Sequence, residues 1–492
     1  MSAVEFCDFS LEALINALGL GVTTDYLGNY LLDLGATAVL REPHYVDRHY
    51  LDEYANYYSR SFRPPAVHCS RLHFFAGWTA EELRQQCVDA ISGSDRRWDV
   101  ERQLTDNYLG FIVRRPLTGA PVGRTVLRTY PADGRRHFEV ARVYSVHLAG
   151  LKLTVNGLAF QNQDRGAAVC ASTALWSSLQ SVARVSGNRT PTPNAITAAA
   201  GSPFPATDGL SAFAMATALR KLGYIADLFG PSGNHDWFRA LLVACLDSGL
   251  PVVLLLVGNG IGHAVAVTGY SEPENVKQMR TPGNGVIPML SAGLSIVYVH
   301  DDNLGPHAHY KLLDVADSNN APQLVLERGN AQNPRPTSWK VDRLTVVAAL
   351  VPKPEKLRLS VPDLLKNSVV FQHFLSFVQP SVFDVKRLNY GARFDSGIEV
   401  KSRIAGGHFE DESRQAFLLG TNLPRHVGVL TASDDGAPFC DLIMDVTEVD
   451  RLPGVPSLLA VIAHAVPKDH PLGRLLGRLA QTLEIPIVYR RA

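Results

Sequence analysis

The chain has few cysteines and no pattern that would pair them. The six are scattered over 492 residues, with no CxxC pair and no spacing typical of metal ligands: Cys7, Cys69, Cys87, Cys170, Cys245 and Cys440. This argues against a familiar zinc site. A reducing, intracellular compartment fits such a chain best.

Long apolar runs and an excess of charge are also absent. The longest apolar run, residues 250–257, is too short to span a bilayer, and the N-terminus lacks the basic region and cleavage site of a secretory signal. Lys+Arg and Asp+Glu both number 47, so nothing points to a nucleic acid or an anionic membrane as partner. We therefore expect a cytoplasmic protein without such partners. Nothing in the sequence indicates the oligomeric state.

The remaining composition, 46% hydrophobic and 19% charged, is typical of a globular protein of two or three domains. We predict an N-terminal α/β domain at residues 1–150. A central domain follows at 151–351, in which helices come first and strands after. A Pro-Lys-Pro step at residues 352–354 then introduces a β-rich C-terminal domain at 352–492. The two flanking domains carry no motif that indicates a function.

Cys170 is the first candidate functional residue. Leu175, Leu179 and Val182 recur at helical spacing and residues 164–166 resemble a turn, so Cys170 is predicted in the first turn of a buried helix. Free backbone N–H groups and the helix dipole lower the pKa of a thiol there and favour the nucleophilic thiolate. A lone cysteine on an apolar helix is, however, more often a small core residue.

The chain also offers a base, an orienting group and an oxyanion donor for such a thiol. His263 begins a predicted strand that continues to Tyr270, and Asp301 ends the next one. If these strands pair antiparallel, Asp301 lies beside His263, fixes its tautomer and stabilises the imidazolium. Gln163, just upstream, can donate a side-chain N–H alongside the Cys170 backbone N–H.

Three alternatives remain open at this level. Asp302 can replace Asp301, because strand register cannot be predicted to one residue. Gln161 can replace Gln163. A metal site is the third alternative, because histidines and aspartates gather within ten residues, although their spacing matches no familiar ligand pattern: His300, Asp301, Asp302, His307 and His309.

Over residues 155–315, this order of motifs resembles the papain-like cysteine peptidases. A Gln precedes a Cys-bearing helix, and a His-Ala-Val-x-x-x-Gly-Tyr strand and a strand ending in Asp follow it. His263 lies 93 residues after Cys170, and an Asp takes the place of the usual Asn, which is closest to the compact bacterial members, the bacteriocin-processing peptidases. The resemblance implies an α+β core with Cys on its N-terminal helix and His and Asp on an antiparallel sheet. It also implies a peptide or protein substrate and neither a metal nor an organic cofactor.

The residues and the resemblance together predict a cysteine hydrolase. Cys170, His263 and Asp301 would form its triad, and Gln163 would hold the oxyanion while a peptide or isopeptide bond is cleaved. A deamidase, transglutaminase or acyltransferase would use the same triad. Because Cys170 lacks the neighbouring residues usual in the family, a catalytically inactive pseudo-peptidase that binds a peptide or protein is the other alternative.

Overall fold

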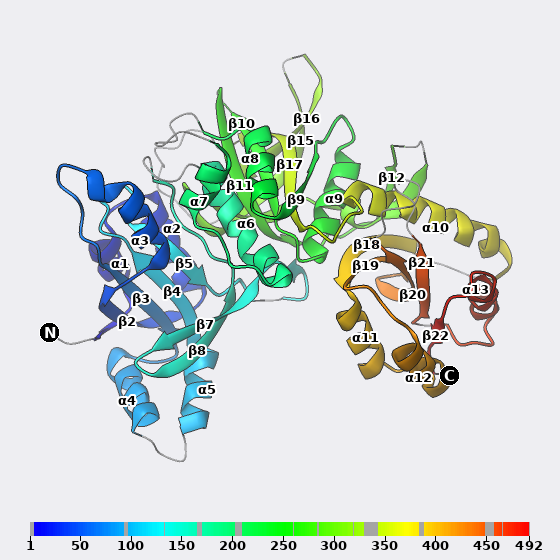
Figure 1. Ribbon diagram of the computed structural model, residues 1–492, viewed down its shortest axis with the longest axis horizontal. Coiled ribbons are helices and arrows are strands. Elements are labelled where there is room, and N and C mark those ends of the chain that lie inside the picture. Colours follow the sequence, from blue (N-terminus) through cyan, green and yellow to red (C-terminus); the bar gives the residue numbers. More distant parts are fainter. Residues whose placement is uncertain are drawn as a thin grey trace. The chain divides into compact units, whose positions relative to one another are not determined.

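The fold is mixed α+β, as predicted, and antiparallel strand pairs predominate among its described strands (Figure 1). The computed structural model describes residues 4–92, 97–131, 133–164, 170–201, 209–258, 260–282, 285–317, 319–328, 343–382, 388–447, 457–464 and 466–491. The chain divides into two compact units. Unit 1 comprises residues 1–229, 251–270 and 296–352, and unit 2 comprises residues 230–250, 271–295 and 353–492.

Unit 1 begins with a five-stranded antiparallel sheet. Its strands lie side by side in chain order: β1 (Glu5–Asp8), β2 (Ala36–Tyr45), β3 (Cys69–Ala76), β4 (Tyr108–Arg114) and β5 (Val122–Leu127). Its helices are α1 (Leu11–Leu18), α2 (Val22–Asp33), α3 (Arg48–Asn56), the 3-10 turn η1 (Tyr58–Arg60), α4 (Ala80–Ile91) and α5 (Arg97–Asn107). Local signals set the helix starts: Ser10 accepts the Ala13 N–H at α1, and Thr79 and Glu82 form a capping box at α4.

The second part of unit 1 is an eight-stranded sheet. It contains β6 (Arg136–His137), β9 (Tyr224–Phe229), β10 (Val252–Gly258), β11 (Ile261–Ser271), β14 (Ile296–Asp301), β15 (Gly305–Ala316), β16 (Pro322–Arg328) and β17 (Arg343–Pro354). Because β17 pairs with β10 as well as with β16, the strands from β10 to β17 close into a ring. Three helices precede most of these strands: α6 (Cys170–Ser186), α7 (Pro193–Ala199) and α8 (Ala212–Lys221). Helix α6 packs against β10 and β14.

Residues 1–150 and the central sheet lie in one compact unit, rather than in the two domains expected from the sequence. Backbone pairing explains this. Strand β6 pairs with β11, and Thr125 exchanges two backbone hydrogen bonds with Phe160, just after the hairpin of β7 (Arg142–Leu148) and β8 (Leu151–Gly157). The crossing at β11 is so close that a Cβ on Gly269 would lie 2.4 Å from the His137 carbonyl oxygen. The glycine of the His-Ala-Val-x-x-x-Gly-Tyr motif is therefore needed for this packing.

Unit 2 is built on a second five-stranded sheet. Its strands are β18 (Leu388–Ser396), β19 (His426–Asp434), β20 (Ala437–Asp445), β21 (Leu458–Ala463) and the parallel β22 (Ile487–Tyr489). Its helices are α9 (His235–Asp247), α10 (Val361–Val382), α11 (Gly397–Gly406), α12 (Asp411–Gly420) and α13 (Pro471–Thr482), and β12 (Lys277–Arg280), β13 (Val286–Met289) and η2 (Ser291–Gly293) also belong to it. The predicted hairpin between β19 and β20 turns at Asp435 and Gly436, both with positive φ. The C-terminal segment of unit 2 starts at residue 353, one residue from the expected domain boundary. Unit 2 also includes residues 230–250 and 271–295, which the sequence assigned to the central domain.

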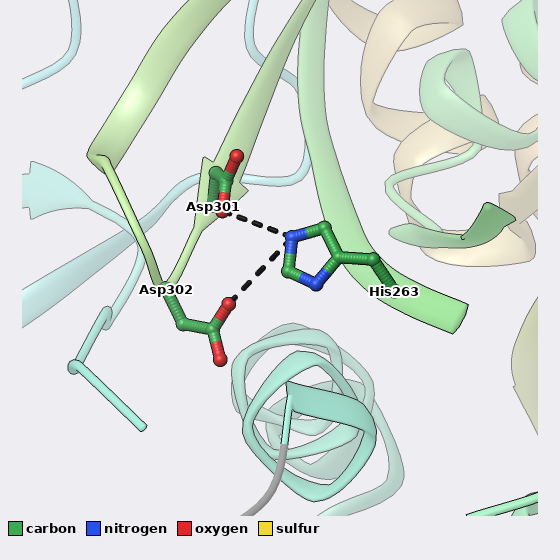
Figure 2. Close-up of side chains that lie close together, drawn as sticks. All are labelled: His263, Asp301 and Asp302. Carbon is green, nitrogen blue, oxygen red and sulfur yellow. Dashed lines mark hydrogen bonds and ion pairs between the residues drawn. The ribbon is translucent and has the colours of Figure 1, made fainter. Parts of the chain in front are cut away.

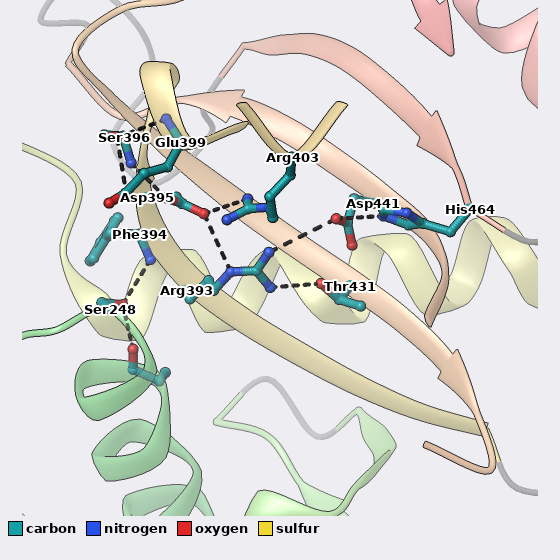
Figure 3. Close-up of polar contacts among 11 residues, drawn as sticks. Ser248, Arg393, Phe394, Asp395, Ser396, Glu399, Arg403, Thr431, Asp441 and His464 are labelled. Carbon is teal, nitrogen blue, oxygen red and sulfur yellow. Dashed lines mark hydrogen bonds and ion pairs between the residues drawn. The ribbon is translucent and has the colours of Figure 1, made fainter. Parts of the chain in front are cut away.

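A polar network crosses this sheet from β18 through β19 and β20 to His464, just after β21 (Figure 3). Arg393 donates to the Thr431 hydroxyl over 3.1 Å, and His464 hydrogen-bonds Asp441 over 2.8 Å. Burial acts to raise the pKa of Asp441, but the His464 hydrogen bond and the charges of His464 and Arg393 lower it. On the same strands Val429, Ile443 and Ile462 belong to the apolar core. These paired polar side chains therefore lie next to the apolar core of the sheet.

No helix in the described part of the chain is long and apolar enough to cross a membrane.

A buried ion pair connects distant segments of unit 1. Arg115 and Glu53 are each 1% exposed, and Arg115 Nη1 lies 3.1 Å from Glu53 Oε2. The guanidinium also donates to the carbonyl oxygens of Ala120 (3.1 Å), Val122 (3.3 Å) and Asn162 (3.0 Å). Burial raises the pKa of Glu53 in spite of its partner. Arg115 thus ties α3, the turn before β5 and the segment before Cys170 together.

We predict that Arg115→Met destabilises unit 1 by about 3 kcal/mol at pH 8, because a buried carboxylate then loses its partner. The loss should be smaller at pH 5, where Glu53 can take up a proton and become neutral. Urea unfolding at the two pH values measures both quantities.

Arg84→Ala is the matched control, because Arg84 and Glu81 form a well-exposed ion pair at 3.8 Å. Its removal should change the unfolding free energy by no more than about 0.5 kcal/mol. An equal effect of both variants would contradict the role assigned to Arg115.

Candidate active site

Three elements of unit 1 bring the predicted residues together. Cys170 is the first residue of α6, and residues 171–183 of this helix are all buried. Strands β11 and β14 pair antiparallel, with Ala266 opposite His300. His263 at the start of β11 and Asp301 at the end of β14 therefore lie at the same end of the pair, as the sequence predicted.

His263 is held by Asp301 (Figure 2). The distance from His263 Nε2 to Asp301 Oδ1 is 3.0 Å, and both residues are buried. Burial alone would lower the pKa of His263. The charge of Asp301, its hydrogen bond, a hydrogen bond with Cys170 and the charge of Asp302 outweigh burial and raise that pKa well above its usual range. The imidazolium form is therefore favoured in this site.

Cys170 lies on the other side of the imidazole. Cys170 is partly exposed, and its interaction with the ring contributes to the raised pKa of His263. In Figure 2, the second ring nitrogen, Nδ1, faces the N-terminal end of α6, while Nε2 faces the two aspartates. The ring thus connects the thiol to a buried carboxylate. Residues 165–169, which include part of the predicted turn before Cys170, lie outside the described residues.

Asp301 and Asp302 differ in their contacts with His263. Asp301 also accepts hydrogen bonds from the Tyr310 hydroxyl (2.6 Å) and the Asn303 N–H (3.1 Å). Burial acts to raise its pKa, but the His263 charge and these hydrogen bonds lower it. Asp302 Oδ1 is 3.8 Å from Nε2, and burial raises the pKa of Asp302 to about 7. Of the two alternatives left open by the sequence, Asp301 is the carboxylate within hydrogen-bond distance.

The two candidate glutamines also lie in different surroundings. Gln163 donates from Nε2 to Asn303 Oδ1 over 3.0 Å, so it is bonded to the turn that follows Asp301. Gln161 is buried and donates to Glu53 over 3.4 Å. Gln163 therefore faces the site, whereas Gln161 supports the buried ion pair.

Sequence reasoning missed two residues around the site. One is Tyr310, whose hydroxyl reaches Asp301 from β15. The other is Asn162, which donates to the Asp302 carbonyl oxygen over 2.6 Å and to Thr23 over 3.1 Å. A tyrosine in a strand is more often a core residue, and an asparagine before a turn is common. Neither pattern indicates these contacts.

The histidines of the predicted metal alternative have hydrogen-bonding roles within the fold. His300 donates from Nε2 to the Leu158 carbonyl oxygen over 3.1 Å and accepts the His307 N–H at Nδ1 over 3.1 Å. His307 Nδ1 lies 2.9 Å from the Thr268 hydroxyl. Burial lowers the pKa of His300 to about 3, so its imidazole is neutral.

His263, Asp301 and Asp302 are close enough together to be considered as metal ligands. One possible ligand atom from each lies within 4.8 Å of the others. A metal there would need a lone pair on His263 Nε2. That nitrogen hydrogen-bonds Asp301, and its neighbours favour the protonated ring. The arrangement therefore fits a proton-bearing imidazole better than a metal ligand.

A thiol next to an imidazole that is oriented by a buried carboxylate can act as a nucleophile and transfer a proton. The N-terminus of α6 adds backbone donors at Cys170, and Gln163 adds a side-chain amide that is bonded to the turn after Asp301. No protein-family model matches this chain, and no curated protein sequence matches it either.

We predict that Asp301→Asn lowers the pKa of His263 by more than one unit. The opposing charge is lost while the burial that disfavours imidazolium remains. Asp302→Asn should lower it less, because Asp302 Oδ1 is 3.8 Å away.

NMR titration of ring-labelled histidines measures this pKa, with the His263 signal identified by its loss in His263→Ala. If Asp302→Asn has the larger effect, Asp302 is the orienting residue and the assignment to Asp301 is wrong.

We further predict that Tyr310→Phe costs about 1.5 kcal/mol of unfolding free energy at pH 7, since the lost hydrogen bond goes to a charged acceptor. The pKa of Asp301 is lowered in the folded state, so its contribution is present above the unfolded value of about 3.9 and is lost as pH falls. The cost of Tyr310→Phe should therefore shrink between pH 7 and pH 3 in urea unfolding.

Tyr26→Phe is the matched control. The Tyr26 hydroxyl donates to the neutral Pro306 carbonyl oxygen over 2.8 Å. Its loss should cost about 1 kcal/mol with no dependence on pH over this range. The same pH dependence in both variants would contradict a special role for Tyr310.

Proposed function

We propose that the protein is a papain-like cysteine hydrolase that cleaves peptide or isopeptide bonds. One observation carries this proposal: the His263 ring hydrogen-bonds the buried Asp301 carboxylate through Nε2, and its other nitrogen faces the N-terminal end of α6, where Cys170 is the first residue. The placement of Cys170 at the start of a buried helix, with His263 and Asp301 on neighbouring antiparallel strands, supports a papain-like core.

The proposed reaction begins from the ion pair in which His263 holds the Cys170 proton. The Cys170 sulfur attacks the substrate carbonyl carbon, and the π electrons move to the oxygen. The Cys170 backbone N–H and the Gln163 side chain hold the resulting oxyanion. His263 then protonates the leaving amine as the C–N bond breaks, which leaves a thioester on Cys170.

A water molecule completes the cycle. His263, now neutral, takes a proton from the water as it attacks the thioester, and the protonated ring returns that proton to the departing sulfur. Asp301 keeps the ring in one tautomer and stabilises its charged form throughout. Tyr310 and the Asn303 N–H hold Asp301 ionised and in place for this role.

We predict that iodoacetamide alkylates Cys170 at pH 5.5 roughly 100-fold faster than Cys7, because the thiolate is stabilised by the imidazolium of His263. Cys7 is the exposed free cysteine of the same chain and serves as an internal reference. Mass spectrometry of timed digests measures both rates.

His263→Ala should remove this advantage at pH 5.5 and leave the rate at Cys7 unchanged. If Cys170 reacts no faster than Cys7 in the unchanged protein, the hydrolase proposal fails. An inactive, peptide-binding protein would then be the better description.

A further inference from the structure

The turn between β14 and β15 connects the orienting carboxylate to Gln163. Asn303 lies in this turn, and its backbone N–H donates to Asp301 Oδ1 over 3.1 Å. The same oxygen lies 3.0 Å from His263 Nε2. The side chain of Asn303 accepts a hydrogen bond at Oδ1 from Gln163 Nε2 over 3.0 Å. One residue therefore contacts both the carboxylate that orients His263 and the side chain that would donate to the oxyanion.

The segment that contains Gln163 is bonded to this turn at a second point. Asn162 Nδ2 donates to the Asp302 carbonyl oxygen over 2.6 Å, and the Asn162 carbonyl oxygen accepts from Arg115 over 3.0 Å. Two consecutive residues of one segment therefore bond two consecutive residues of the other. Because the backbones of both segments are held in this way, the freedom that remains at Gln163 is that of its side chain.

The usual reasons for an asparagine in a turn do not account for Asn303. Asparagine is common in turns because it tolerates a positive φ or because its side chain bonds the nearby backbone. Asn303 is not among the described residues with a positive φ. Its amide contacts two other side chains instead: Oδ1 accepts from Gln163, and Nδ2 lies 3.5 Å from Asp302 Oδ1. The amide is thus oriented with its oxygen toward Gln163.

Packing alone does not select one conformation of the Gln163 side chain. Gln163 and Asn303 are half-buried and line a cavity of about 790 Å³, whose wall also includes residues 18–24 and 117–122. Ordering a glutamine side chain costs conformational entropy, and a donor that is ordered before the reaction stabilises an oxyanion better than a mobile one. Gln163 Nε2 carries two N–H groups. The bond to Asn303 uses one of them and leaves the other for the oxyanion.

We propose that Asn303 is a positioning residue of the reaction, whose side-chain oxygen holds the Gln163 amide in place to donate to the oxyanion. This inference rests on the proposed function. The backbone N–H and the side chain of Asn303 have separate roles, because the first supports Asp301 and the second acts on Gln163. Replacement of Asn303 by alanine keeps the first contact and removes the second.

Two reagents that modify Cys170 of the full chain by different chemistry test the inference without a known substrate. The Cys170 sulfur attacks p-nitrophenyl acetate at the carbonyl carbon, so an oxyanion forms before the C–O bond breaks. The p-nitrophenolate leaves with the electron pair, and an acetyl thioester remains on Cys170. With iodoacetamide, the sulfur attacks the CH₂ carbon and iodide leaves, so no oxyanion forms.

The ratio of the acylation rate to the alkylation rate at pH 7 therefore reports the stabilisation of the oxyanion. Both reactions use the thiolate, so a change in the thiolate fraction cancels in the ratio. Acylation is measured as the release of p-nitrophenolate above that given by Cys170→Ala. Alkylation is measured by mass spectrometry of timed digests.

We predict that Asn303→Ala lowers this ratio by about fivefold and Gln163→Ala by about 20-fold, because a misplaced donor stabilises the oxyanion less and a missing one not at all. Asn107→Ala is the matched control and should leave the ratio unchanged, because the Asn107 amide donates to the Gln103 carbonyl oxygen within α5. A loss smaller than about threefold in either of the first two variants, or an equal loss in the control, overturns the inference.

A double variant tests whether Asn303 acts through Gln163. Once Gln163 is replaced by alanine, the additional change Asn303→Ala should lower the ratio by less than about threefold, because the side chain that Asn303 holds is already absent. A larger additional loss means that Asn303 acts on the reaction by another route, and the inference is then wrong.

Asn303→Asp is the rescue variant, because a carboxylate oxygen at this position still accepts from Gln163. Its ratio should stay within about threefold of that of the unchanged protein. A loss as large as that in Asn303→Ala would contradict the role assigned to the side-chain oxygen.

The two proposals fail separately in these experiments. Slow alkylation of Cys170 at pH 5.5 rejects the hydrolase, whatever the ratio of the two rates. Fast alkylation with a ratio that Asn303→Ala leaves unchanged keeps the pairing of Cys170 with His263 and rejects the positioning role of Asn303.

Discussion

The buried guanidinium of Arg115 is the interaction on which the arrangement of unit 1 depends. It pairs with Glu53 and donates to three carbonyl oxygens, those of Ala120, Val122 and Asn162. A buried charge is tolerated only where its donors are satisfied, so these segments are tied to one geometry. All three carbonyl residues also line the cavity beside the candidate site. The stability of the fold and the shape of the cavity therefore rest on the same residue.

Asp301 and Asp302 show how neighbouring residues of one type acquire different chemistry. Both are buried, and burial acts to raise the pKa of each. Asp301 receives hydrogen bonds from His263, Tyr310 and Asn303 that outweigh this cost. Asp302 Oδ1 is farther from His263 Nε2, at 3.8 Å, and Asp302 Oδ2 has no hydrogen-bond partner among the described residues. The first carboxylate is suited to hold a charged imidazole, whereas burial raises the pKa of the second to about 7.

The sequence predicted the parts of the fold and site that depend on local pattern. The helical spacing after Cys170, the strands that carry His263 and Asp301, and the turn at Asp435 and Gly436 all appear in the structure. It did not predict the contacts of Tyr310 and Arg115 or the division into units. Those depend on pairings between distant segments, and a one-residue change of register would place different side chains in the site. Asp301 was the predicted partner of His263 and is the carboxylate at hydrogen-bond distance, but the sequence alone left Asp302 open as an alternative for this reason.

The division into units changes how the N-terminal region relates to the site. The sequence predicts a separate N-terminal α/β domain at residues 1–150, without a motif that indicates a function. Because β6 pairs with β11 and the Arg115 contacts reach Asn162, the region belongs to the same compact unit as Cys170, His263 and Asp301. Residues 18–24, around the loop between α1 and α2, and residues 117–122, around the loop before β5, thus line the same cavity as Gln163 and Asp302. Loops tolerate substitution more readily than the strands and helix that hold a triad. Substitutions in these loops can therefore change the shape of the cavity while the helix and strands that hold Cys170, His263 and Asp301 stay fixed.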